Sequence, residues 1–141
     1  MYTTILHATD FSETHFRMCQ QAMEVALRFN ATLYLLHVIE PPVSLQLAQG
    51  LGFAEFDSPL KEDAETVMRT LGDALNIPPS QQFVEIGSIK GHTLDKIKRL
   101  NCDLLIIGSH TQSNLPAILD STARGIITEA TCDVLTLRAP D

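Results

Sequence analysis

The sequence predicts an α/β fold in which one open sheet of five parallel strands carries helices on both faces. Short apolar runs bounded by turn residues alternate along the chain with segments whose apolar residues recur at helical spacing. Such alternation implies a parallel sheet, and right-handed crossovers leave few topologies for it. The length of 141 residues suits a single domain, 1–141. We therefore expect the strand order 3-2-1-4-5.

The first part of the chain is expected to form two strands with a helix between them. Thr3 to Thr9 and Ala31 to Ile39 are apolar runs, and the second ends at two prolines. Between them, apolar residues at helical spacing predict a helix from about Glu13 to Phe29. Ser12 is a candidate N-cap of this helix and Asn30 a candidate stop.

The middle of the chain begins with a long segment that has no clear periodicity. Val43 to Pro59 contains two glycines and few charges, so we expect a loop with at most one short helix, of the kind that often covers a binding site. Leu60 to Leu75 is the second predicted helix, because its acidic first turn suits the helix dipole. Gln82 to Ile86 is the third predicted strand, and Gly91 to Leu100 the third helix.

The last part of the chain predicts a strand, a loop, a helix and a final strand. Asp103 to Ile107 is a continuous apolar run that stops at Gly108. A polar loop follows, and apolar residues then recur at helical spacing from Ile118 to Ala130. Asp133 to Arg138 is the fifth predicted strand, and its place in the expected order makes it an edge strand.

Composition and charge exclude several classes of protein. Hydrophobic residues make up 45% and charged residues 19%, which is typical of a globular protein and not of a disordered one. The net charge of −7 argues against binding to nucleic acid and to an acidic membrane surface. We see no signal peptide and no apolar run long enough to span a membrane, so we expect a cytoplasmic protein.

The cysteines and histidines do not predict a metal site. The three cysteines lie far apart without a Cys-x-x-Cys pair, so we expect reduced and mostly buried thiols. The five histidines have no short ligand spacing. His7 and His37 fall inside predicted strands, where we expect hydrogen-bonded core histidines. No metal ligands are therefore assigned.

The crevice between the first and fourth strands is where a ligand is expected. In open α/β sheets, ligands bind beyond the carboxyl ends of the strands at the point where the strand order reverses. Asp10 and Gly108 both face that point. Asp10 can accept hydrogen bonds from ligand hydroxyls and amines, or it can cap the following helix. Gly108 can let a ligand approach the backbone, or it can serve a tight turn.

The loop and helix after the fourth strand offer further candidates. Ser121 and Thr122 lie near the N-terminus of the last helix, where free N–H groups and the helix dipole favour anions such as phosphate. Alternatively, Asp120 or Ser121 only caps that helix. His110 lies in the crevice loop. The sequence has no G-x-S-x-G elbow, no G-x-x-x-x-G-K-[ST] phosphate loop and no G-x-G-x-x-G after the first strand.

Taken together, these motifs resemble the universal stress protein family. The likeness covers nearly the whole chain and rests on four stretches: ATDFSET from Ala8, LLHVIE from Leu35, CDLLIIGSH from Cys102 and the closing CDVLTL. It implies a Rossmann-like, adenine nucleotide alpha hydrolase-like fold. It also implies a homodimer in which the last strand, Asp133 to Arg138, pairs with its copy.

The nucleotide-binding branch of that family resembles a pattern G-x2-G-x9-G-[ST]. On this chain Gly108 and Thr122 match its ends, but Thr111 and Ser121 stand where the other two glycines would be. Those glycines let backbone amides wrap phosphates without a Cβ in the way. The resemblance implies a binding site with the following residues: Ala8, Thr9, Asp10, Val38, Gly108, Ser109, His110, Ser121 and Thr122.

Two functions follow from the resemblance. The first is a non-catalytic stress-response and interaction module that has no cofactor, acts as a dimer and binds protein clients. The alternative is a stress regulator that binds ATP or AMP with magnesium and hydrolyses ATP slowly. Because two glycines are replaced, we expect an open pocket for adenosine without a grip on the triphosphate.

Overall fold

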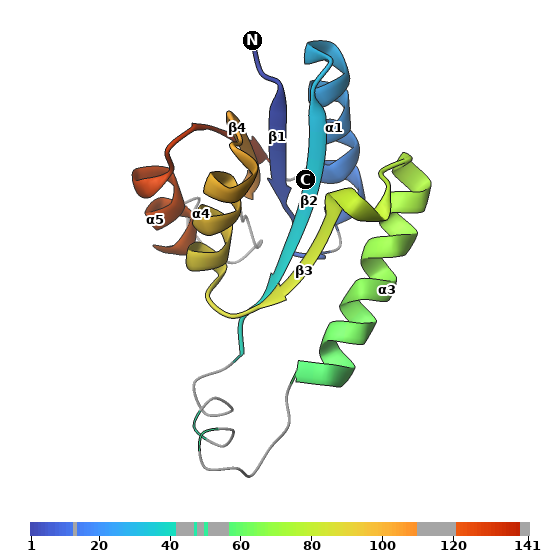
Figure 1. The fold of residues 1–141 in the computed structure, drawn as a ribbon, viewed down its shortest axis with the longest axis vertical. Coiled ribbons are helices and arrows are strands. Elements are labelled where there is room, and N and C mark those ends of the chain that lie inside the picture. Colours follow the sequence, from blue (N-terminus) through green and yellow to red (C-terminus); the bar gives the residue numbers. More distant parts are fainter. Residues whose placement is uncertain (13, 42–46, 48–49, 51–56, 110–120, 139–141) are drawn as a thin grey trace.

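The computed structural model describes residues 1–12, 14–41, 47, 50, 57–109 and 121–138. Figure 1 shows a twisted sheet flanked by helices on its two sides. The elements in chain order are β1 (Thr4–Ala8), α1 (His15–Phe29), β2 (Thr32–Ile39), α3 (Asp57–Leu75), the 3-10 turn η1 (Pro79–Gln81), β3 (Gln82–Ile86), α4 (Ile89–Leu100), β4 (Leu104–Ser109), α5 (Ser121–Glu129) and β5 (Asp133–Arg138).

The strands form one parallel sheet in the order β3-β2-β1-β4-β5, which confirms the predicted topology. The order reverses at β1, which lies between β2 and β4. Ala8, the last residue of β1, is paired with Leu36 on one side and with Ile107 on the other. The carboxyl ends of β1, β2 and β4 therefore meet at the same edge of the sheet, as a binding crevice requires.

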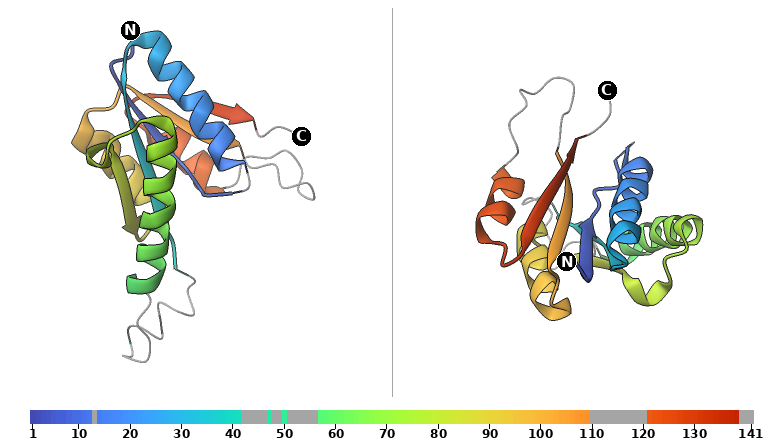
Figure 2. Two further views of the ribbon diagram at one scale, coloured as in Figure 1. Left: turned by 90° about the vertical axis from the view of Figure 1, so that its right-hand side faces the viewer. Right: turned by 90° about the horizontal axis from the view of Figure 1, so that it is seen from above.

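Two hydrophobic cores lie on opposite faces of the sheet. Helices α1 and α3 cover one face, and α4 and α5 cover the other (Figure 2). Alternation along β1 sends Ile5 into the first core and Leu6 into the second, and both side chains are fully buried. Every central strand is thus buried on both faces, which explains the continuous apolar runs in the sequence.

The helix boundaries correct some of the sequence predictions. Thr14, and not Ser12, occupies the N-cap of α1, and it makes no side-chain cap bond. Helix α3 begins at Asp57 rather than at Leu60. Helix α4 begins at Ile89 rather than at Gly91, because the Ser88 hydroxyl caps it by accepting from Gly91 N at 3.1 Å. The predicted stop of α1 at Asn30 is correct: Asn30 adopts a left-handed conformation with φ 52°.

Three further findings concern predictions made for the whole chain. Most of the loop expected over Val43 to Pro59 lies outside the described residues. All three cysteines are free thiols, and Cys19 and Cys102 are buried. Burial raises the pKa of the Cys19 thiol to about 12, so it stays protonated and unreactive at neutral pH. Among the described helices, none combines the length and apolar character needed to cross a membrane.

Candidate functional site

The turn that follows β1 is held by a local set of hydrogen bonds. Thr9 N donates to the Leu36 carbonyl at 2.8 Å, which keeps the end of β1 against β2. The Asp10 carboxylate accepts from Ser12 N at 2.9 Å, so Asp10 caps the turn before α1 rather than the helix itself. Phe11 has φ 56°, which is unusual for an aromatic residue, and its ring stacks on His37 at 3.9 Å. These contacts hold the backbone of residues 9–12 in one conformation beside the crevice.

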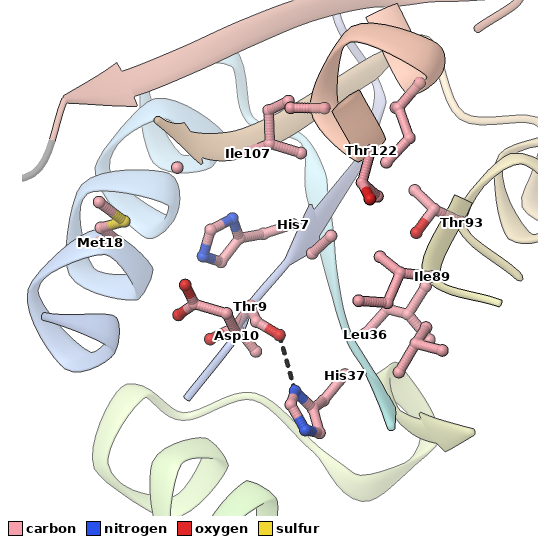
Figure 3. Close-up of a pocket in the computed structure, with 15 residues that line it drawn as sticks. His7, Thr9, Asp10, Met18, Leu36, His37, Ile89, Thr93, Ile107 and Thr122 are labelled. Atoms are coloured by element: carbon pink, nitrogen blue, oxygen red, sulfur yellow. Dashed lines mark hydrogen bonds between the residues drawn. The ribbon is translucent and has the colours of Figure 1, made fainter. Parts of the chain in front are cut away.

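A pocket of about 220 Å³ opens at this edge of the sheet. Its walls come from the ends of β1, β2 and β4 and from α1, α4 and α5 (Figure 3). This volume lies below the range of about 300–1,000 Å³ that is typical for pockets enclosing drug-sized ligands. The lining residues are His7, Ala8, Thr9, Asp10, Met18, Leu36, His37, Val38, Ile89, Thr93, Ile107, Gly108, Thr122, Ala123 and Ile126.

Both histidines of the pocket are held by backbone carbonyls. Nδ1 of His7 lies 2.9 Å from the Ile106 carbonyl oxygen, and Nδ1 of His37 lies 2.8 Å from that of Thr9. Since a carbonyl can only accept, each Nδ1 carries a proton. Burial lowers the pKa of both His7 and His37, which favours neutral rings. The structure confirms that His7 is a core histidine, since it is only 1% exposed.

The described lining of the pocket contains one carboxylate and no Lys or Arg. Asp10 is an exposed carboxylate at the rim, and no Lys or Arg belongs to the lining residues given above. Within the part of the chain that the structure describes, no group of three or more His, Cys, Asp and Glu side chains could hold a metal ion. The pocket therefore presents apolar walls, a few hydrogen-bonding groups and one negative charge.

Most of the site residues expected from the sequence gather at this pocket. Ala8, Thr9, Asp10, Val38, Gly108 and Thr122 all line it. Ser121 is the exposed first residue of α5 and does not belong to the lining, in contrast to its neighbour Thr122. Ser109 is the last residue of β4, and its side chain lies outside the described part of the structure. His110 lies outside the described residues.

Several lining residues were not predicted as site residues. Met18 comes from α1, whereas Ile89 and Thr93 come from the first turns of α4. The sequence offered one signal for the α4 wall: Thr93 is a polar residue in the inward stripe that also contains Ile89 and Ile97. Met18 gave no such signal, because an apolar residue on the inner face of a helix is normally part of the core.

The chain is similar in sequence to known proteins over nearly its whole length. Residues 1–138 match the model of the universal stress protein family. The chain is 33% identical over 140 residues to universal stress protein A homolog 1 of Coxiella burnetii, covering 95% of this chain and 94% of the relative.

Two solved structures share the fold. The universal stress protein UspA from Lactobacillus plantarum aligns with a TM-score of 0.74 and 21% identity over 97% of this chain and 98% of that one. A universal stress protein solved in complex with cAMP aligns with a TM-score of 0.70 and 17% identity over 99% of this chain and 98% of that one. The family match, which spans nearly the entire sequence, shows that the chain belongs to the universal stress protein family.

Proposed function

We propose that this protein is a non-catalytic, cytoplasmic stress-response module that acts as a homodimer, and that its pocket takes the nucleoside part of an adenine nucleotide. The observation that carries the proposal is the pocket itself. Ala8, Thr9, Asp10 and Val38 lie together there, at the ends of β1 and β2. The structure of one universal stress protein with the same fold was solved in complex with cAMP. A small apolar pocket with few polar groups suits a flat heterocycle.

The size and charge of the pocket favour a nucleoside or a monophosphate over a triphosphate. A cavity of about 220 Å³ leaves a triphosphate tail outside it. The first turn of α5 borders the pocket through Thr122, and a helix N-terminus can stabilise a single phosphate. Further charge on the ligand would meet Asp10 without a lining Lys or Arg to offset it. A magnesium triphosphate grip therefore does not enter the proposal.

We assign no catalytic role, because the titratable side chains of the pocket already make hydrogen bonds within the protein. Asp10 accepts from Ser12 N, and the Nδ1 atoms of both histidines are bound to backbone carbonyls. A general base also has to reach the reacting group, and the other ring nitrogen of His7, Nε2, is buried away from solvent. Rings that are tied to the backbone and favoured in the neutral state serve better as fixed hydrogen-bond acceptors.

The proposed dimer uses the free edge of the sheet. Strand β5 pairs with β4 on one side only, and Leu135 on this strand is 36% exposed. An apolar edge strand is a template for pairing with another chain. Two copies related by a two-fold axis would pair their β5 strands antiparallel and cover Leu135. Protein clients would then bind to other surfaces of the dimer.

Isothermal titration with adenosine, AMP and ATP tests the ligand part of the proposal. We expect adenosine or AMP to bind, and Asp10→Ala to weaken that binding. A hydrogen bond to a charged group is worth about 1.5–3 kcal/mol, or roughly tenfold to over a hundredfold in affinity. Asp73→Ala is the matched control, because it removes an exposed carboxylate from α3. No heat from any of the three ligands would refute the proposed pocket.

A further inference from the structure

A groove of about 240 Å³ opens between α1 and α3, away from the pocket beyond β1. The first residues of α1 form one wall, and a stripe of α3 from Thr66 to Ala74 forms the other. Figure 2 shows both helices on the same side of the sheet. We propose that this groove is the docking site for a basic amphipathic helix of a partner protein. The inference rests on the client-binding part of the proposed function and names the surface and the chemistry of the client.

Two large apolar side chains are exposed in this groove, one from each wall. Phe16 of α1 is 42% exposed and Val67 of α3 is 39% exposed. Single exposed apolar side chains are ordinary on a protein surface, and Leu27 of α1, at 71%, is one of them. Phe16 and Val67 differ from Leu27 because they line one hollow. An apolar hollow that stays open to solvent is typical of an interaction site.

The polar side chains of the α3 wall are satisfied within their own helix. The Thr66 hydroxyl donates to the Glu62 carbonyl and the Thr70 hydroxyl to the Thr66 carbonyl, both at 3.0 Å. These bonds leave the threonine methyl groups to contact a partner. On the α1 wall, Nδ1 of His15 is bound to the Ser12 carbonyl. The groove therefore favours apolar side chains of a partner over a small polar ligand.

The shape of the groove suits the side chains of a helix. Its volume lies below the range of about 300–1,000 Å³ that is typical for pockets enclosing drug-sized ligands, so it receives a few side chains. The lining positions 66, 67, 70, 71 and 74 form one stripe along α3. A partner helix that lies along this stripe inserts apolar residues at the spacing i, i+3 or i+4, and i+7. An extended peptide would instead need a free sheet edge, and both walls here are helices.

The charge beside the groove favours a basic partner. Helix α3 carries five carboxylates against two cations. Glu62, Asp63 and Asp73 are exposed and stand three or four residues from lining residues, so helical spacing puts them beside the groove. Arg69 is a cation on this border, and its side chain donates to Thr66 Oγ1 at 3.3 Å. Lysines on the polar face of a docked helix would meet the carboxylates while their stems cover apolar surface.

The same charges disfavour a second copy of this chain as the occupant. Pairing of two copies through this face would set the carboxylates of one α3 against those of the other. Arg17 of α1 also adjoins the groove, yet the three bordering carboxylates still outnumber Arg17 and Arg69. The net charge of −7 adds a longer-range attraction for a basic partner.

Fluorescence anisotropy with two labelled peptides tests the inference on the full chain. Each peptide has about 18 residues, long enough to form a helix, and carries leucines at helical spacing. One has lysines on its polar face and the other has glutamates. We expect the Leu/Lys peptide to bind, and the Leu/Glu peptide to bind more weakly by about tenfold or more, because its charge has the same sign as that of α3. Equal binding of the two peptides, or no binding of the Leu/Lys peptide, overturns the inference.

Neutral polar substitutions separate the groove from the rest of the surface. Val67→Gln should weaken binding of the Leu/Lys peptide by about fivefold or more, because it removes an apolar anchor. Leu27→Gln is the matched control, since Leu27 is an exposed apolar residue of α1 outside the groove lining. Val67→Ile, which keeps the apolar anchor, should bind as the unmodified protein does. Normal binding by Val67→Gln overturns the inference.

Charge reversal tests the orientation of the docked helix. Asp63→Lys should weaken binding of the Leu/Lys peptide by about fivefold or more, because a charge beside the groove lies within the Debye length of about 8 Å at physiological salt. Glu65→Lys makes the same change on α3, but Glu65 is two residues from Val67 and lies on another side of the helix. It should have a clearly smaller effect. Equal effects of the two reversals contradict docking in the groove.

Two further measurements identify the occupant and keep the proposed pocket separate. If a second copy filled the groove, Val67→Gln would lower the mass given by light scattering, and this result overturns the inference. Val67→Gln should bind adenosine as the unmodified protein does, since Val67 is not among the residues that line the pocket beyond β1. Absence of adenosine binding in every protein would refute that pocket, whereas the peptide titrations alone decide the groove.

Discussion

The side chain of Met18 lies directly against the backbone of Gly108: a Cβ atom added to Gly108 would come within 2.6 Å of Met18 Sδ and 3.0 Å of its Cε. The contact joins α1 to the end of β4 across the crevice. An added Cβ would have to displace the flexible end of Met18, so protein packing favours glycine here whether or not a ligand approaches it. Both residues line the pocket, so any change in this contact also changes the pocket.

We predict that Gly108→Ala destabilises the protein and reduces adenosine binding, because Met18 has to turn toward the pocket. Overpacking of a core costs about 1–3 kcal/mol, and we expect the low end of that range because the clashing atoms end a flexible side chain. In a Met18→Ala background the same change should cost much less, since the clashing thioether is absent. Denaturant unfolding of the four proteins gives the coupling between the two sites. Strictly additive effects would show that the two side chains do not meet as described.

The glycine pattern of the sequence makes a separate prediction about ATP. Changing both Thr111 and Ser121 to Gly should create or strengthen ATP binding, because two Cβ atoms leave the expected phosphate path. Thr111 lies outside the described residues, so this prediction rests on the sequence. Adding Asp10→Ala should abolish the gain. Titration of the three proteins with ATP decides it, and micromolar ATP binding by the unmodified chain would contradict the glycine argument.

We predict that Leu135→Lys converts a homodimer into a monomer. The substitution places a charge on the exposed face of the edge strand β5, where it would have to be buried between two copies. Ser80→Lys is the control, because it adds the same charge to the exposed turn η1 beside the opposite edge of the sheet. Light scattering should give a dimer mass for the unmodified and control proteins. A monomer mass for the unmodified protein at micromolar concentration would remove the proposed interface.

We predict that the protein loses stability as the pH falls below 6.5, the ordinary pKa of histidine. Burial lowers the pKa of His7 and His37, so the unfolded chain takes up protons that the folded protein refuses. Their contribution to stability is complete above 6.5 and is lost as the pH drops toward the folded values. Each group can lower the free energy of unfolding by about 1.4 kcal/mol per pH unit in that window.

Urea unfolding at a series of pH values checks this prediction. The His7→Asn variant, which has no titrating group at this position, should show a shallower decline than the unmodified protein. The comparison uses the slope, so a general loss of stability in the variant does not affect it. Equal slopes for the two proteins would mean that His7 titrates normally in the folded state.

The topology was predictable from the sequence because each central strand is buried on both faces. The apolar runs at Thr3 to Thr9 and Asp103 to Ile107 indicate such strands. The preference for right-handed crossovers then restricts the order of the strands in the sheet. Helix starts were harder, since they depend on single capping bonds. Ser88 caps α4 with its hydroxyl. Ser12 is an equally good candidate by residue type, but its hydroxyl lies 3.3 Å from that of Thr14, and its carbonyl accepts from His15 N at 3.0 Å.

The candidate site was partly predictable, because the predicted strand order also locates the crevice of the sheet. Asp10 and Gly108 follow from the switch point of the sheet, which the strand order fixes. Met18 could not be found, because its role depends on the distance between α1 and β4 and not on its residue type. Thr93 was overlooked because a buried helical threonine normally satisfies itself within the helix. In the folded protein, however, its hydroxyl has no hydrogen-bond partner among the residues that the structure describes.

Parallel titration of the unmodified protein with adenosine and with ATP tests the central claim most directly. The pocket of about 220 Å³ beside Asp10 is mostly apolar and has no Lys or Arg among its described lining residues. We therefore predict that adenosine binds and that ATP binds more weakly by about tenfold or more, which corresponds to about 1.4 kcal/mol. ATP binding as tight as that of adenosine, or no binding of adenosine, would contradict it.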